Sequence, residues 1–142
     1  MDATAIGILF TADAQSKLDA ITTFSEHLRS EGKEVHLLEF QPAKKDLVFS
    51  AFPSFTQKQI GFWGTIESQE AKQFMAKPLD YLFLADAEPG PVLRHILSRS
   101  SARCRVGRNS DGVQDYLDLM VEMNGPWNEL LETMLQFVRK LS

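Results

Sequence analysis

The sequence has almost no cysteine and no long apolar run. Its single cysteine, Cys104, excludes a disulfide within the chain, and no stretch approaches the roughly 20 apolar residues that a membrane-spanning helix needs. The segment Met1-Asp2-Ala3 is not the basic start of an apolar stretch, so we expect no signal peptide. These absences together predict a cytoplasmic protein without a membrane partner.

An excess of positive charge is also missing. Against 15 Lys and Arg stand 19 Asp and Glu, which gives a formal net charge of −4. Proteins that bind nucleic-acid backbones usually carry the opposite balance, so we expect no nucleic-acid partner. The 142 residues, 44% of them hydrophobic and 24% charged, suit one globular domain, and we assign residues 1–142 to it.

The common catalytic signatures are absent as well. The loop expected after the first strand, Thr11-Ala12-Asp13-Ala14, has no glycine to cradle a phosphate, and the chain holds neither a P-loop nor a Gly-x-Ser-x-Gly turn. The histidines at positions 27, 36 and 95 stand singly, without metal-ligand spacing. A cysteine inside a strand is usually an inert packing residue. We therefore predict no cofactor and no metal, and we do not favour an enzyme.

What the sequence does contain is an alternation of apolar runs and amphipathic stretches, typical of an α/β fold. Apolar runs predict strands at 5–10, 35–40, 79–85, 103–106 and 116–122. Helical periodicity predicts helices over 14–30, between Ser68 and Pro78, from Pro91 through Leu97, and from Pro126 to Leu141. In the first helix Lys17 falls among the polar positions, and Thr11 or Asp13 is the expected N-cap.

The order of these elements indicates a three-layer sandwich with a Rossmann-like, mostly parallel sheet. The stretch 116–122 alternates apolar and polar residues, which suits a strand at the edge of the sheet or one antiparallel to it.

The segment from Gln41 to Glu67 has no clean period but is rich in aromatic residues. Its aromatics are Phe49, Phe52, Phe55, Phe62 and Trp63. They fill an edge of the core in the interpretation that we favour, and otherwise they mark a partner surface. The run Thr56-Gln57-Lys58-Gln59 fits a capping box, and a brief strand is possible at 61–63.

An arginine cluster stands out in this acidic chain. Five of the seven arginines are Arg94, Arg99, Arg103, Arg105 and Arg108, and no carboxylate lies between Glu88 and Asp111. The guanidinium fork suits phosphate or carboxylate groups, so Arg105 and Arg108 are candidate ligands for an anion. The alternative is a solvated basic face that pairs with surface acids.

Acidic residues follow two of the predicted strands. Asp13 and Asp86 each come after an apolar run, and adjacent parallel strands would bring them close together. With Thr11 they form a second set of candidate ligand-binding residues, and the two carboxylates could hold a metal, act as acid and base, or accept hydroxyl groups from a sugar. Helix capping and loop solvation are the alternative.

Four short stretches carry a family resemblance: Thr56–Gly64 with its aromatic pair before a glycine, Leu79–Leu82, Ala102–Gly107 and Asp118–Val121. With them, over about its last two thirds, the chain resembles an uncharacterised family of small α/β proteins from Bacteroidetes, a family that implies no activity. Arg105-Val106-Gly107 is also similar to a strand in the N-terminal Rossmann-like half of heptosyltransferase-type glycosyltransferases. The nucleotide-sugar-binding half of those enzymes has no counterpart here, which argues against catalysis by that route.

Three hypotheses for function follow. In the first, the domain binds a small anionic ligand, a nucleotide or sugar phosphate, through Arg105 and Arg108, with the threonine and the two aspartates at the pocket mouth. In the second, it is a homodimer or scaffold whose interface is the C-terminal edge strand or the aromatic segment. An enzyme that uses the two aspartates ranks last, because no pair of nucleophile and base can be named.

Overall fold

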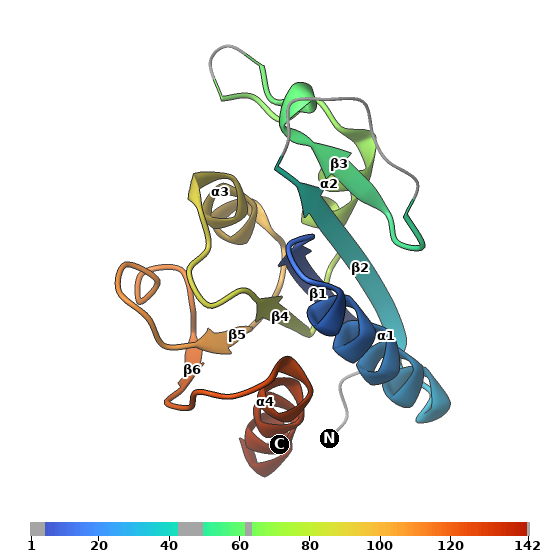
Figure 1. Cartoon of the computed structure of the whole chain (residues 1–142), viewed down its shortest axis with the longest axis vertical. Helices are drawn as coiled ribbons and strands as arrows, with labels where there is room; N and C mark the ends of the chain where they lie inside the picture. The colour runs from blue at the N-terminus through green and yellow to red at the C-terminus, as the bar shows by residue number, and fades with distance from the viewer. Residues whose placement is uncertain (1–4, 43–49, 62–63, 142) are drawn as a thin grey trace.

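The computed structural model describes residues 5–42, 50–61 and 64–141. These residues form a six-stranded sheet in the order β3-β2-β1-β4-β5-β6, and each neighbouring pair of strands is parallel (Figure 1). The strands are β1 (Ala5–Thr11), β2 (Glu34–Gln41), β3 (Ser54–Thr56), β4 (Tyr81–Ala85), β5 (Arg105–Arg108) and β6 (Leu119–Val121). This is the strand order of a Rossmann-type doubly wound sheet, so the predicted fold class is confirmed.

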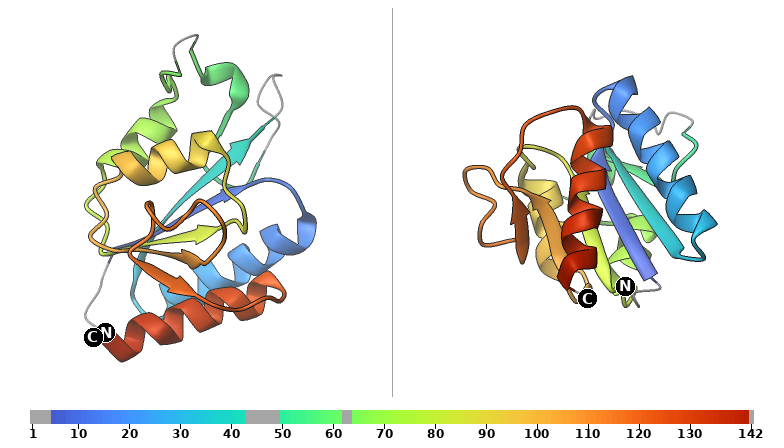
Figure 2. Two further views of the ribbon diagram at one scale, coloured as in Figure 1. Left: turned by 90° about the vertical axis from the view of Figure 1, so that its left-hand side faces the viewer. Right: turned by 90° about the horizontal axis from the view of Figure 1, so that it is seen from below.

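Four α-helices of the described residues cover both faces of the sheet. They are α1 (Gln15–Ser30), α2 (Gln69–Ala76), α3 (Pro91–Arg99) and α4 (Trp127–Leu141). The side chains of α1 and α4 pack in one apolar core, and those of α2 and α3 pack in a second core on the opposite face. Figure 2 shows the resulting three layers. None of the helices in the described ranges has the length and apolar character needed to cross a bilayer.

Alternate residues of β1 enter the two cores, because both faces of the sheet are covered. Phe10 packs on the side of α1 and α4, whereas Leu9 packs on the side of α2 and α3. At Gly7, side chains of the core on the side of α2 and α3 lie very close to the backbone of β1. A Cβ there would lie 2.5 Å from Leu79 Cδ1 and 3.1 Å from Phe74 Cζ. Because Phe74 belongs to α2, the absence of a side chain at Gly7 lets this helix sit close to the sheet.

The C-terminal strands differ from the expectation in extent and direction. β5 begins at Arg105, later than predicted, and β6 covers only the residues Leu119–Val121. The connection between them returns the chain to the start of β5, where the Asp118 N–H donates to Arg105 O at 2.8 Å and the Asp118 carboxylate accepts from the Arg105 N–H at 2.7 Å. β6 therefore runs parallel to β5. The predicted edge position is confirmed, and the antiparallel alternative is wrong.

The aromatic segment contributes to the core where the structure describes it. Phe55, in β3, is fully buried, and Phe52 packs edge-on against Phe10 with ring centroids 5.3 Å apart. The favoured core interpretation is thus confirmed for these two side chains. The other aromatics of the segment lie outside the described residues; they are Phe49, Phe62 and Trp63.

Local helix signals in this region are confirmed by the structure. Thr56 and Gln59 form the predicted capping box, which begins a short 3₁₀ turn. Ser68 caps α2, where its hydroxyl oxygen accepts from the Ala71 N–H at 3.2 Å. The strand predicted at 61–63 falls partly outside the described residues, and the strand of this segment is β3 instead.

Candidate functional site

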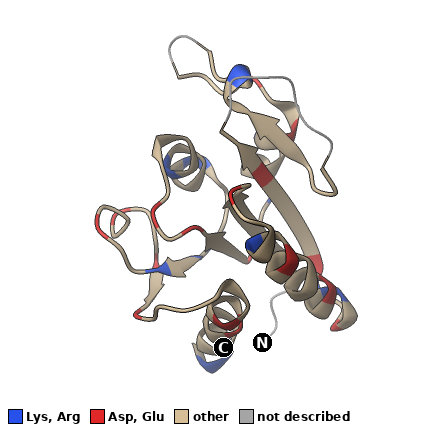
Figure 3. Cartoon of the chain, in the orientation of Figure 1, with Lys and Arg blue, Asp and Glu red and all other residues tan. Residues whose placement is uncertain are grey.

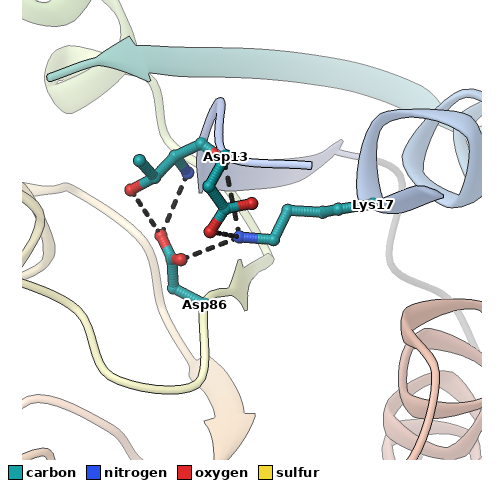
Figure 4. A network of polar contacts seen from close by, with 4 residues as sticks. Asp13, Lys17 and Asp86 are labelled. Atoms are coloured by element: carbon teal, nitrogen blue, oxygen red, sulfur yellow. Dashed lines mark hydrogen bonds and ion pairs between the residues drawn. The ribbon is translucent and has the colours of Figure 1, made fainter. Parts of the chain in front are cut away.

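The carboxyl ends of β1 and β4 meet in the middle of the sheet. Thr11 ends β1, and its N–H and hydroxyl both donate to Asp86 Oδ2, at 3.0 and 2.7 Å. Lys17 Nζ donates to Asp86 Oδ1 at 2.8 Å and to Asp13 Oδ2 at 3.0 Å. Figure 4 shows Asp13, Lys17 and Asp86 converging. The structure thus brings the predicted residues Thr11, Asp13 and Asp86 together, and these three with Lys17 are called the aspartate–lysine network below.

Lys17 is the member of this network that the sequence analysis placed elsewhere. Expected on the polar side of its helix, it is only 2% exposed. Its ammonium group also lies 5.4 Å from the ring centroid of Trp127, at the start of α4, within the range of a cation–π contact. The one hint in the sequence is the spacing of Asp13 and Lys17, four residues apart, which favours an ion pair along a helix.

The aspartate–lysine network is satisfied by its own members. Both carboxylate oxygens of Asp86 accept hydrogen bonds, and this residue is 7% exposed. Two carboxylates and one ammonium group leave a formal negative charge, which opposes the binding of an anion. The predicted N-cap is wrong: Ala14 occupies the N-cap position of α1, and the side chains of Thr11 and Asp13 bond within the network. The arrangement is suited to joining β1, β4 and α1.

Arg105 lies toward the amino ends of the strands, away from the network. It is the first residue of β5 and pairs with Leu82, four positions before Asp86, which is roughly 13 Å of strand. Its Nε donates to Leu97 O at 2.6 Å and its Nη2 donates to Ser100 O at 2.8 Å. The guanidinium group therefore binds the last carbonyl groups of α3. The structure does not bring it to Asp13 or Asp86; the aspartate that it contacts is Asp118, at 3.6 Å.

Arg108 ends β5 at the same edge as the network, but its side chain binds elsewhere. Its Nε donates to Met123 O at 3.0 Å, and its Nη2 donates to the side chain of Asn124. These contacts hold the connection between β6 and α4. Of the predicted site residues, the structure thus joins the threonine and both aspartates, gives Arg108 other partners and separates Arg105.

A cleft of about 620 Å³ lies on the face of the sheet that α2 and α3 cover, where Figure 2 shows these helices side by side. Its lining residues are Gly64, Thr65, Ile66, Lys72, Met75, Ala76, His95, Arg99 and Ser101. The Ser101 N–H donates to Met75 O at 2.9 Å, which ties the ends of the two helices together. This hollow is called the α2–α3 cleft below.

Three basic side chains line the α2–α3 cleft. Lys72 comes from α2, and His95 and Arg99 come from α3, one helical turn apart. Of the described residues that line the cleft, none is acidic. None of these three side chains forms a hydrogen bond or an ion pair within the described part of the chain. Figure 3 shows α3 with basic but no acidic residues. The cleft therefore brings together two unpaired cations, Lys72 and Arg99, and a histidine in an acidic protein.

The sequence indicates only part of this cleft. Arg99 belongs to the arginine cluster, whereas His95 stands singly and no sequence pattern marks Lys72. The spacing of His95 and Arg99 does place them on one helix face. The position of Lys72 beside them depends on how α2 packs against α3, which no local pattern reports.

Cys104 lies just before β5 and not inside the strand that the sequence predicted for it. It is partly buried against the core of α1 and α4. Burial raises the pKa of its thiol, the negative charge of Asp118 raises this pKa further, and Arg105 opposes the rise. A thiol that keeps its proton is a poor nucleophile. Within the described ranges, no three His, Cys, Asp or Glu side chains are grouped as a metal site would require.

Comparison with known proteins places the fold and the family. No curated protein matches the chain. The chain is similar to the solved structure of a glycosyl transferase family 9 protein from Veillonella parvula DSM 2008, with a TM-score of 0.59 and 12% identity over 96% of this chain. It spans 42% of that protein, and at this identity the likeness concerns the fold alone. Residues 1–141 match a family of unknown function, DUF6913, and the chain belongs to that family.

Proposed function

We propose that this domain binds a small anionic ligand, a phosphate-bearing metabolite, in the α2–α3 cleft, without acting on it chemically. One observation carries the proposal: Lys72, His95 and Arg99 line one cleft and none of them has an ion-pair partner among the described residues. Unpaired cations around a hollow attract anions, and the guanidinium fork binds a phosphate through two parallel hydrogen bonds.

The arrangement of the cleft supports this function. His95 and Arg99 lie one turn apart on the same helix, so their side chains can reach one bound group. Lys72 stands on the second wall, and Ser101 and Thr65 add hydroxyl groups that can donate to phosphate oxygens. The cleft volume of about 620 Å³ falls within the range of small-molecule sites, which is roughly 300–1,000 Å³.

The aspartate–lysine network supports the function less well, although it lies where ligands of open α/β sheets usually bind. Its one cation already contacts two carboxylates, at 2.8 and 3.0 Å. A phosphate placed there would meet a formal negative charge and would have to displace a buried ion pair, which is costly.

Calorimetric titration of the wild-type protein with inorganic phosphate, pyrophosphate and ribose 5-phosphate tests the proposal. We expect binding that weakens as salt is added, because the contacts are electrostatic. Arg99→Ala should weaken it about 10- to 100-fold, since a hydrogen bond to a charged group contributes about 1.5–3 kcal/mol.

Arg103→Ala is the matched control. It removes the same charge, but the Arg103 side chain is 83% exposed and lies 3.7 Å from Asp80 instead of in the cleft. We expect this variant to bind phosphate like the wild type. If Arg103→Ala weakens binding as much as Arg99→Ala does, the general charge of the domain is responsible and the cleft is not the site. If none of the three anions binds, the proposed function is wrong.

We also keep as proposals the cytoplasmic location and the Bacteroidetes origin that the sequence suggests. The lone cysteine supports the first, and the four motif stretches support the second.

A further inference from the structure

We infer that the ligand of the α2–α3 cleft is a phosphate ester with a planar, largely apolar body, as in a nucleoside monophosphate. The inference rests on the proposed function and concerns the apolar residues that line the cleft, which are Ile66, Met75 and Ala76. A cleft lined by both cationic and apolar side chains suits a ligand with an anionic end and an apolar end.

The apolar lining residues come from α2 and from the bridge that precedes it. Met75 lies three residues after Lys72 on α2, so the two side chains share one face of this helix. Ile66 is 6% exposed and is held by an antiparallel bridge to Ile60. Near it, the Gly61 N–H donates to Thr65 O at 2.7 Å. The apolar surface is thus part of the fixed fold beside the cations.

Gly64 adds no side chain to the lining of the cleft. Its φ is +81°, a conformation that residues with a Cβ rarely adopt. A Cβ built at this position would meet open space.

The size of the cleft also favours an ester over a free ion. An inorganic phosphate is only a few water molecules in size, so it would leave most of the 620 Å³ filled with water. A planar ring gains from the contact with a methionine thioether and from release of water at an apolar wall. A sugar phosphate has a hydroxyl group in place of the planar base, so it gains neither the thioether contact nor the release of water. These preferences distinguish a nucleotide from a sugar phosphate.

Parallel titrations of the full chain with inorganic phosphate, ribose 5-phosphate, AMP and adenosine test the inference. We expect AMP to bind about tenfold more tightly than ribose 5-phosphate, because the upper end of the energy range for a sulfur–aromatic contact corresponds to about a tenfold gain in affinity. Met75→Gln should remove most of this advantage, measured as the ratio of the affinities for AMP and ribose 5-phosphate. Met75→Leu keeps an apolar side chain of similar volume and should keep most of the advantage.

The possible results separate this inference from the proposed function. If phosphate binds but AMP binds no tighter than ribose 5-phosphate, the inference is wrong and the anion site stands. Equal AMP affinity in Met75→Gln and the wild type also overturns it, provided that circular dichroism shows both proteins folded. If phosphate, ribose 5-phosphate and AMP all fail to bind, the proposed function fails with it.

Discussion

The aspartate–lysine network and the α2–α3 cleft are both lined by charged side chains, but only in the first are these charges paired. Lys17 is buried and lies 2.8 Å from Asp86 and 3.0 Å from Asp13. The basic side chains of the cleft have no ion-pair partner among the described residues. Charge that is already paired holds a fold together, whereas unpaired charge around a hollow can recruit a ligand.

The two regions also show that sheet topology and charge balance point to different places for the ligand site. In an open α/β sheet, ligands usually bind at the carboxyl ends of the strands, where the strand order reverses. In this chain that point lies between β1 and β4, where the ammonium group of Lys17 is held by Asp86. The topology therefore marks a place that the protein uses for its own ion pair.

Lys17→Met should have the largest effect. Methionine keeps much of the volume of the lysine stem but leaves Asp86 buried without a cation, and we expect the free energy of unfolding to fall by about 3–5 kcal/mol. Urea denaturation followed by circular dichroism measures this. Phosphate affinity of the folded variant should not change, because the cleft lies on the other face of the sheet.

Asp13→Asn is the matched control for that experiment. The Asp13 side chain is 50% exposed, and ion pairs with an exposed partner contribute only about 0–1 kcal/mol. Equal losses of stability in the two variants would contradict the view that the Lys17–Asp86 pair carries the network. A loss of phosphate binding in folded Lys17→Met protein would move the ligand site to the network.

Arg105→Met should have the second largest effect, on stability more than on binding. The side chain is 20% exposed, and it donates to Leu97 O and Ser100 O at the end of α3. Losing charged donors to these carbonyl groups should cost about 2 kcal/mol. If Arg105 were instead a direct contact to the anion, as the sequence suggested, phosphate affinity would fall steeply while the unfolding midpoint in urea stayed constant.

The fold could be predicted from the sequence to a large extent because its signals are local. Apolar runs covered on both faces indicated β1, β2 and β4, and periodicity indicated the helices. The network could be predicted in part, since Asp13 and Asp86 follow neighbouring parallel strands. Lys17 could not, because a lysine among polar helix positions looks solvated until the distant Asp86 is placed beside it.

The cleft could not be predicted for the same reason. Its two walls come from different βα units, and their distance is set by the order of the strands. Local spacing can pair His95 with Arg99, but only the packing of α2 beside α3 adds Lys72. Arg105 was misleading in the opposite way: its position in a basic cluster says nothing about the helix end that it binds.

Gly7→Ala tests how far the cleft depends on the position of α2 against the sheet. The new Cβ would lie 2.5 Å from Leu79 Cδ1 and 3.1 Å from Phe74 Cζ, so side chains beneath α2 must shift. We expect a loss of about 1–2 kcal/mol, the lower part of the range for overpacking, because the nearest atom is the end of a leucine side chain. Phosphate affinity should fall with it. The aspartate–lysine network should be unaffected, so that Lys17→Met lowers the free energy of unfolding by the same amount in Gly7→Ala protein as in the wild type. Full phosphate affinity in a clearly destabilised Gly7→Ala protein would contradict the coupling.

The smallest effect concerns Cys104, which is partly buried against the core of α1 and α4 and lies next to Arg105. Burial and Asp118 raise the pKa of the thiol above its ordinary 9.0. The folded state therefore holds this proton more tightly than the unfolded state. The contribution of the thiol to the free energy of unfolding is fully present below pH 9 and is lost as pH rises through the pKa of the folded state. We expect iodoacetamide to label the native thiol at pH 8 several-fold more slowly than the thiol in urea. Arg105→Met should slow labelling of the native thiol further, because it removes the positive charge that lowers this pKa. Equal labelling rates for native and unfolded protein would show that the thiol is not shielded in the folded state.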